Sequence, residues 1–116
     1  MKRIFSFATG NIYRWSKNKN SLINIVKKLK VDGVEITISS KEELFSFRLS
    51  KNNKIWLKSL DYVTVHSPFR LVRRAKNENE IIKQLDVISK LSGEINAKNV
   101  IIHPTDLPSP EILNRY

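Results

Sequence analysis

Two similar stretches, separated by one long amphipathic segment, decide the fold. They read Asp61-Tyr62-Val63-Thr64-Val65-His66 and Asn99-Val100-Ile101-Ile102-His103, and a proline follows each within two residues. Short runs that are rich in β-branched residues and stopped by proline are typical of strands. Between them a helix of about four turns is predicted from Glu80. Its apolar stripe consists of Ile81, Leu85, Ile88, Leu91 and Ile95.

The same alternation extends back to the N-terminus. Strands are predicted over 3–8 and 34–38, and helices over 21–30 and 54–60. Gly33 follows the first helix, where we expect it to supply the positive φ of a helix-to-strand turn. Ser40 and Glu43 have the spacing of a capping box that begins a short helix. Ser109-Pro110 begins a last helix, since serine caps well and proline suits the first helical position.

Four strand–helix units in alternation predict parallel strands with right-handed helical crossovers. The strands are interpreted as apolar on both faces, as in a sheet buried on both sides. Eight such units make a barrel of about 250 residues, whereas the 116 residues here contain four. The sequence therefore predicts an α/β domain over 1–116 that is the N-terminal half of a (β/α)8 TIM barrel, truncated at its C-terminus.

The structural alternative is a small, open, doubly wound sheet. That fold usually has a glycine-rich phosphate loop after its first strand. The chain contains only three glycines and no such loop, which favours the half-barrel.

Composition excludes several classes of protein. Hydrophobic residues make up 41% of the chain and charged residues 28%, an ordinary globular mixture. The absence of cysteine excludes disulfides and thiolate metal sites. No apolar run reaches the roughly 18 residues of a membrane span, and the N-terminus does not resemble a signal peptide. We therefore expect a cytoplasmic protein without a membrane partner.

The net charge of +10 results from 21 basic and 11 acidic residues. Such an excess can attract nucleic acid or phosphorylated substrates. The basic residues are interpreted as scattered, with lysines such as Lys19 on the outer faces of helices. Only Arg70, Arg73 and Arg74 cluster in a predicted loop. They are expected either to bind phosphate at the mouth of the barrel or to be solvated.

The two histidines of the chain, His66 and His103, each end a predicted strand. In parallel α/β folds the functional site forms at this carboxyl edge. Neighbouring strands lie about 4.8 Å apart, so that two imidazoles can meet one ion. We therefore predict His66 and His103 as ligands of a divalent metal, with zinc or manganese expected. The alternative for each is a structural histidine that bonds a nearby carbonyl.

Further candidates occupy the same edge. Glu35, in the second strand, is the candidate catalytic carboxylate. Alternatively it binds the metal, holds a ligand histidine or pairs with a cation such as Arg14, because buried carboxylates need partners. Asn11, Arg70 and Asp106 follow the first, third and fourth strands and are the candidate substrate- or phosphate-binding residues. For Asp106 the alternative is a local bond in a proline-rich turn.

The motif Val65-His66-Ser67-Pro68-Phe69, followed by a long helix and Ala97-Lys98-Asn99-Val100-Ile101-Ile102-His103-Pro104, resembles the xylose isomerase-like TIM barrels. This superfamily includes sugar and sugar-phosphate isomerases and epimerases, and the endonuclease IV family of apurinic-site nucleases. Asp32-Gly33-Val34-Glu35-Ile36 is similar to its second strand. The resemblance spans almost the whole chain but only the first half of the family fold. It implies that His66 and His103 bind metal and that the remaining ligands come from strands five to eight.

Three functions follow as expectations. The first is a divalent-metal-dependent enzyme that isomerises or epimerises a sugar or sugar phosphate, with a carboxylate or histidine moving the proton. The second is phosphodiester hydrolysis at abasic DNA, which the positive charge favours. In the endonuclease IV family, glycine normally follows the second His-Pro motif, whereas here Thr105 follows it. The third is an inactive half-barrel that pairs with its own copy, because open sheet edges promote association. The fragment alone is expected to be inactive.

Overall fold

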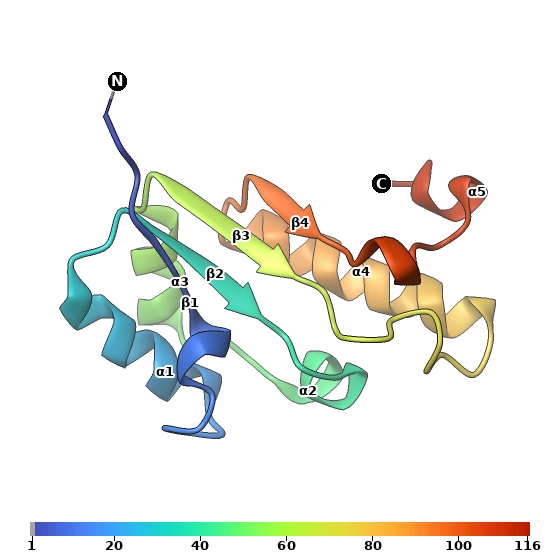
Figure 1. Ribbon diagram of the computed structural model, residues 1–116, viewed down its shortest axis with the longest axis horizontal. Coiled ribbons are helices and arrows are strands. Elements are labelled where there is room, and N and C mark those ends of the chain that lie inside the picture. The colour runs from blue at the N-terminus through green and yellow to red at the C-terminus, as the bar shows by residue number, and fades with distance from the viewer. Residues whose placement is uncertain (1) are drawn as a thin grey trace.

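The computed structural model describes residues 2–116, which form one parallel sheet and a layer of helices (Figure 1). The strands are β1 (Ser6–Ala8), β2 (Gly33–Thr37), β3 (Tyr62–His66) and β4 (Asn99–Ile101). The α-helices are α1 (Lys19–Val26), α2 (Lys41–Ser46), α3 (Lys51–Lys58), α4 (Glu78–Glu94) and α5 (Pro110–Leu113). Short 3-10 helices are η1 (Thr9–Ile12), η2 (Lys27–Leu29) and η3 (Pro104–Asp106). The predicted α/β alternation with parallel strands is confirmed.

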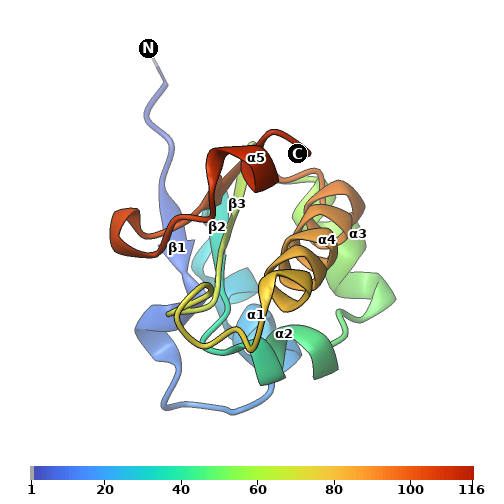
Figure 2. The same ribbon diagram turned by 90° about the vertical axis from the view of Figure 1, so that its right-hand side faces the viewer.

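The strands lie side by side in the order in which they occur in the chain, β1-β2-β3-β4, and every neighbouring pair is parallel. Right-handed crossovers between strands in sequential order place the connecting helices on a single face. Figure 2 accordingly shows α3 and α4 on one side of the sheet. A doubly wound sheet needs a reversal of strand order, and the sheet of residues 2–116 contains none, so that alternative is wrong.

The hydrophobic core lies between the sheet and this helix layer. Val34, Ile36, Val63 and Val65 point from β2 and β3 into it and are almost completely buried. Helices α1, α3 and α4 cover them with Leu22, Ile23, Val26, Leu57, Leu85, Ile88 and Leu91. Burying an aliphatic side chain of this size contributes about 1.5–3 kcal/mol, so this interface holds the helices against the sheet.

The opposite face of the sheet is polar. Because successive side chains of a strand point to opposite faces, Glu35 and Thr37 of β2, with Thr64 and His66 of β3, point away from the core. Thr64 is buried, and the other three are only half-buried. The prediction of two apolar faces is therefore wrong. The alternation was already present in the sequence, since a polar residue occupies every second position of both strands.

Side-chain caps determine where several helices begin. The hydroxyl of Ser40 accepts a hydrogen bond from the backbone N–H of Glu43, and that of Ser109 accepts one from Ile112, as predicted. Helix α1 begins two residues earlier than predicted, because Asn18 caps it. Among the helices of residues 2–116, none combines the length and hydrophobicity that crossing a bilayer requires.

The turn before β2 differs from the expectation for Gly33. No glycine in residues 2–116 has a positive φ; Lys30, with φ of 50°, adopts the left-handed conformation that ends η2. Gly33 is required for a different reason. A Cβ there would collide with the backbone carbonyl oxygen of Tyr62 and would come within 3.2 Å of the Ser6 side chain.

We predict that Gly33→Ala lowers the free energy of unfolding by about 1–3 kcal/mol, because the added methyl forces β2 and β3 apart. Gly93→Ala is the matched control, since a Cβ on Gly93 of α4 meets nothing within 4 Å. It should stabilise the protein by up to about 1 kcal/mol through helix propensity. Urea unfolding of both variants measures the difference, and equal stabilities would contradict the account of Gly33.

Candidate functional site

The carboxyl ends of β1, β2 and β3 border an open cavity of about 720 Å³. This is the edge at which parallel α/β folds form their sites. Of the predicted site residues, Asn11, Glu35 and His66 line the cavity. Arg70, His103 and Asp106 do not line it. The other principal lining side chains are Tyr13, Lys17, Lys19, Thr37, Ser39, Glu43 and Phe69.

Thr37 organises the floor of the cavity. Its hydroxyl accepts a hydrogen bond from the backbone N–H of Gly10 at 3.1 Å and donates one to Oε1 of Glu35 at 3.3 Å. Its own backbone N–H donates to the hydroxyl of Thr9, which is completely buried. The Glu35 carboxylate is thus oriented by a neutral donor. The expected pairing with Arg14 is not formed, because Arg14 donates instead to the Tyr13 hydroxyl at 3.0 Å.

Lys19 is a cavity residue that sequence reasoning missed. Its side chain is only 8% exposed, and its ammonium lies 2.7 Å from Oε1 of Glu43 and donates to the carbonyl oxygen of Thr37 at 2.5 Å. The interpretation of Lys19 as an outer-face lysine is therefore wrong. The two contacts join α1 to α2 and to the end of β2, so they fix the elements that surround the cavity.

His66 and His103 come together, as the sequence predicts for adjacent strand ends. Their ring centroids are 4.9 Å apart and the ring planes are inclined by 65°. Nδ1 of His66 lies 2.8 Å from the carbonyl oxygen of Ser67. A carbonyl oxygen only accepts hydrogen bonds, so Nδ1 is the donor, and in the neutral imidazole Nε2 then keeps its lone pair.

Phe69 covers the histidine pair. Its ring stacks on His103 with a centroid distance of 4.8 Å and lies 5.6 Å from the ring of His66. Nε2 of His103 is buried and has no hydrogen-bond partner within residues 2–116. A buried nitrogen without a partner is costly, and this one lies beside a second imidazole whose lone pair is free.

The arrangement fits part of a metal site. A metal–nitrogen bond is about 2.0–2.1 Å long. When one ring nitrogen of a histidine binds a metal, the other commonly donates a hydrogen bond to a carbonyl oxygen, as Nδ1 of His66 does here. The ring separation of 4.9 Å is compatible with two imidazoles on one ion. Residues 2–116 contain no group of three or more potential ligands, so the two histidines can supply only part of a coordination shell.

The loop 67–77, which the basic and polar composition predicts over 69–79, is held at several points. Oδ1 of Asp106 accepts hydrogen bonds from the backbone N–H groups of Val72 and Arg73 at 3.1 and 3.2 Å, and Asp106 is only 6% exposed. Buried Gln84 donates to the carbonyl of Leu71 at 3.1 Å. These bonds hold the loop that carries Phe69. Arg70, with φ of 58°, is exposed beside them.

Glu80 fixes the end of the same loop. Its carboxylate accepts hydrogen bonds from the backbone N–H of Lys76 at 2.5 Å and from the ammonium of Lys41 at 3.1 Å. The Lys76 hydrogen bond and then the Lys41 ammonium hold the pKa of Glu80 below its ordinary value. Lys41 also donates to the carbonyl of Arg74 at 2.8 Å, so α2, the loop and α4 are joined at one point.

Comparisons of the chain with protein-family models, with curated proteins and with solved structures gave no match. The chemistry of the site is therefore interpreted from its own geometry.

We predict that Asp106→Ala lowers the free energy of unfolding by about 1–3 kcal/mol, because the buried Asp106 carboxylate no longer accepts hydrogen bonds from two N–H groups of the loop. Glu111→Ala removes an exposed carboxylate that makes no hydrogen bond or ion pair within residues 2–116, and it should change stability by less than about 0.5 kcal/mol. Thermal unfolding compares the two variants. Equal stability of both, with loss of sugar binding only in Asp106→Ala, would instead assign Asp106 to the substrate.

Proposed function

We propose that the chain forms the first four β/α units of a TIM barrel, and that the carboxyl edge of its sheet belongs to a metal-dependent enzyme that isomerises or epimerises a sugar or sugar phosphate. The observation that carries this proposal is the histidine pair. His66 ends β3 and His103 follows the end of neighbouring β4 by two residues, with the two rings 4.9 Å apart. Each ring has a nitrogen that has no hydrogen-bond partner within residues 2–116 and that could bind a metal.

The sheet supports the barrel part of the proposal. Sequential parallel strands with all crossover helices on one face are the repeating arrangement of a (β/α)8 barrel. The polar face that carries Glu35, Thr37 and His66 would then be the barrel interior near the mouth. Within residues 2–116, β1 and β4 each have one edge without a neighbouring strand, and four further β/α units would close the barrel between these edges.

His66 and His103 would hold a zinc or manganese ion, and ligands from the second half of the barrel would complete its shell. When bound, such an ion acts as a Lewis acid toward a carbonyl or hydroxyl oxygen of the substrate. The Ser67 carbonyl holds His66 in the tautomer that leaves Nε2 free. Phe69 stacks on His103 and lies beside His66.

Glu35 is the carboxylate placed to move a proton. It lines the cavity, and its only hydrogen bond within residues 2–116 comes from the Thr37 hydroxyl, so one carboxylate oxygen stays available as a base. Asn11 and Tyr13 line the same cavity and can bond sugar hydroxyl groups as donors or acceptors.

The charges around the cavity favour a sugar over a DNA backbone. The lining contains two lysines: buried Lys19 is neutralised by Glu43, and exposed Lys17 forms no ion pair within residues 2–116, so the lining offers one free cation. Arg70, Arg73 and Arg74 lie outside the lining. A phosphodiester site needs cations aimed at its phosphates, so apurinic-site hydrolysis is the second candidate, with the net charge of +10 in its favour.

We predict that the chain binds one Zn²⁺ or Mn²⁺ ion and that His66→Ala and His103→Ala each weaken binding by at least about tenfold, since each removes one of two nitrogen ligands. Isothermal titration calorimetry measures the affinities. Glu111→Gln, which removes an exposed carboxylate of α5, is the control and should bind metal normally. Unchanged affinity in both histidine variants would contradict the metal site.

We further predict that pentoses, hexoses and their phosphates bind in the cavity with millimolar affinity, as expected for a few polar contacts. Saturation-transfer NMR detects such binding, and Asn11→Ala and Glu35→Gln should each weaken it about threefold to tenfold. Lys83→Gln, an exposed position on α4, is the control. Binding of an abasic duplex without any sugar binding would favour the nuclease candidate instead.

A further inference from the structure

The positive charge of the chain is concentrated in two segments. Residues 1–31 contain eight lysines and arginines and no acidic residue, and residues 44–60 contain four and none. The rest of the chain therefore holds nine of the 21 basic residues and all 11 acidic ones. The two segments have a combined charge of +12, whereas the remainder is slightly negative. The interpretation of the basic residues as scattered overlooked this separation.

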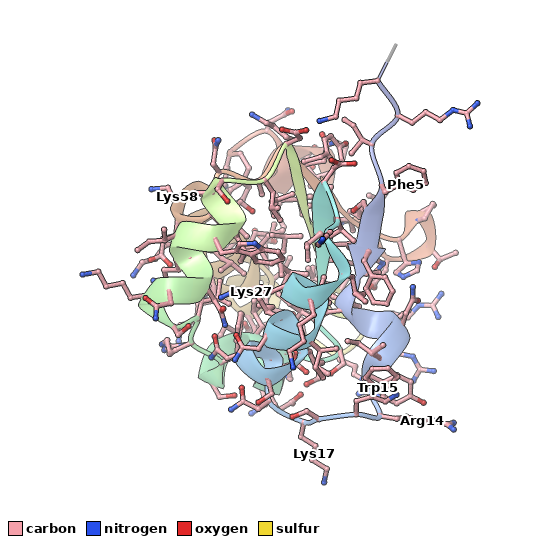
Figure 3. The ribbon with its side chains drawn as sticks, turned by 90° about the vertical axis from the view of Figure 1, so that its left-hand side faces the viewer. Phe5, Arg14, Trp15, Lys17, Lys27 and Lys58 are labelled. Carbon is pink, nitrogen blue, oxygen red and sulfur yellow. The ribbon has the colours of Figure 1, made fainter. Side chains whose placement is uncertain are left out.

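The fold brings the two segments together on one side of the molecule. They form β1, α1 and α3, and α1 is joined to α3 by a hydrogen bond from the Asn53 amide to the Asn20 side chain at 3.0 Å. Figure 3 shows this side, with Arg14, Lys17, Lys27 and Lys58 spread across it. These four cations are called the basic face.

Among residues 2–116, no carboxylate pairs with a cation of the basic face. The ion pairs of the two segments use other lysines: Lys2 pairs with Asp61 and Asp32, Lys19 with Glu43, and Lys54 with Glu94. Within residues 2–116, none of the four cations of the basic face forms an ion pair. A concentration of unneutralised cations produces a positive potential that attracts polyanions.

Exposed aromatic rings border the basic face. Phe5 is 70% exposed and Trp15 is 68% exposed, and Figure 3 shows both on the same side as the cations. Lys27 lies over the ring of a further aromatic residue, Trp56, at 5.6 Å. Aromatic rings beside a basic surface are the arrangement on which single-stranded nucleic acids stack their bases.

A membrane surface fits the basic face less well than a nucleic acid. Helices that lie on membranes need an apolar face that is free to enter the lipid. Here α1 buries Leu22, Ile23 and Val26 in the core, and α3 buries Leu57. The exposed aromatic rings belong to the segments around β1 and not to an amphipathic helix.

We propose that the basic face binds single-stranded nucleic acid, with Arg14, Lys17, Lys27 and Lys58 contacting phosphates and with Trp15 and Phe5 stacking on bases. Neither histidine belongs to the six residues of this site, and Lys17 is the one of the six that also lines the cavity. The proposal therefore does not rest on the proposed enzymatic function.

The test is fluorescence anisotropy with a labelled 15-nucleotide thymidine strand at about 50 mM salt, where phosphate contacts are strong. The double variant Lys27→Glu with Lys58→Glu should weaken binding by at least about tenfold and make it less salt-dependent. The control double variant Lys83→Glu with Lys90→Glu makes the same charge change at exposed positions of α4. It should weaken binding by less than about threefold.

Two further variants separate stacking and the metal site from charge. Trp15→Ala should weaken binding about fivefold or more without changing the salt dependence, because a stacked base is lost and no charge is removed. His66→Ala with His103→Ala should bind the strand normally, even if it has lost its metal.

Four outcomes would overturn the proposal. The first is no binding at low salt, and the second is equal weakening by both charge-reversal pairs, which would show an effect of net charge alone. The third is a duplex of the same length that binds more tightly than the single strand, with no effect of Trp15→Ala. The fourth is binding to phosphatidylserine vesicles that the strand does not displace, which would assign the face to a membrane surface.

Discussion

The sequential order of four parallel strands is the constraint on which the rest of the structure depends. Right-handed crossovers between strands in that order must place the connecting helices on the same face of the sheet. One face therefore becomes the core, where Val34, Ile36, Val63 and Val65 meet the helices. The alternate residues of the same strands are left on the other face, where polar side chains stand beside an open cavity. The residues of the candidate site at the strand ends lie on that second face and at its carboxyl edge.

The histidine pair shows how topology and local bonding act together. Adjacent parallel strands bring His66 and His103 to neighbouring positions, and the Ser67 carbonyl accepts a hydrogen bond from Nδ1 of His66. The loop after β3 places Phe69 across both rings, and it can do so because Asp106 holds its backbone from beyond β4. The histidine pair, Phe69 and the loop that Asp106 anchors thus form one structural unit. The basic face consists of Arg14 and Lys17 before α1, Lys27 after it and Lys58 of α3, and it shares only Lys17 with the cavity lining.

Local signals in the sequence were sufficient for the elements and for the histidines. The β-branched runs marked the strands, Ser40 and Ser109 marked helix starts, and a histidine at each of two strand ends predicted their meeting. Features that depend on distant partners could not be found in this way. The burial of Lys19 requires Glu43, and the anchoring role of Asp106 requires backbone groups 33 and 34 residues away. The polar alternation of β2 and β3 and the separation of charge are both present in the sequence, and the predictions of apolar strands and scattered charge miss them.

The central claim is that topology brings two imidazoles together with a nitrogen of each available to a metal. The most direct measurement is long-range ¹H–¹⁵N NMR of the metal-free protein at a pH of about 8, where unperturbed histidines are neutral. The chain has only two histidines, so the spectrum is unambiguous. We predict that His66 is protonated on Nδ1 and that its ring protons show nuclear Overhauser effects to His103. Protonation of His66 on Nε2, with no such effect between the rings, would contradict the account.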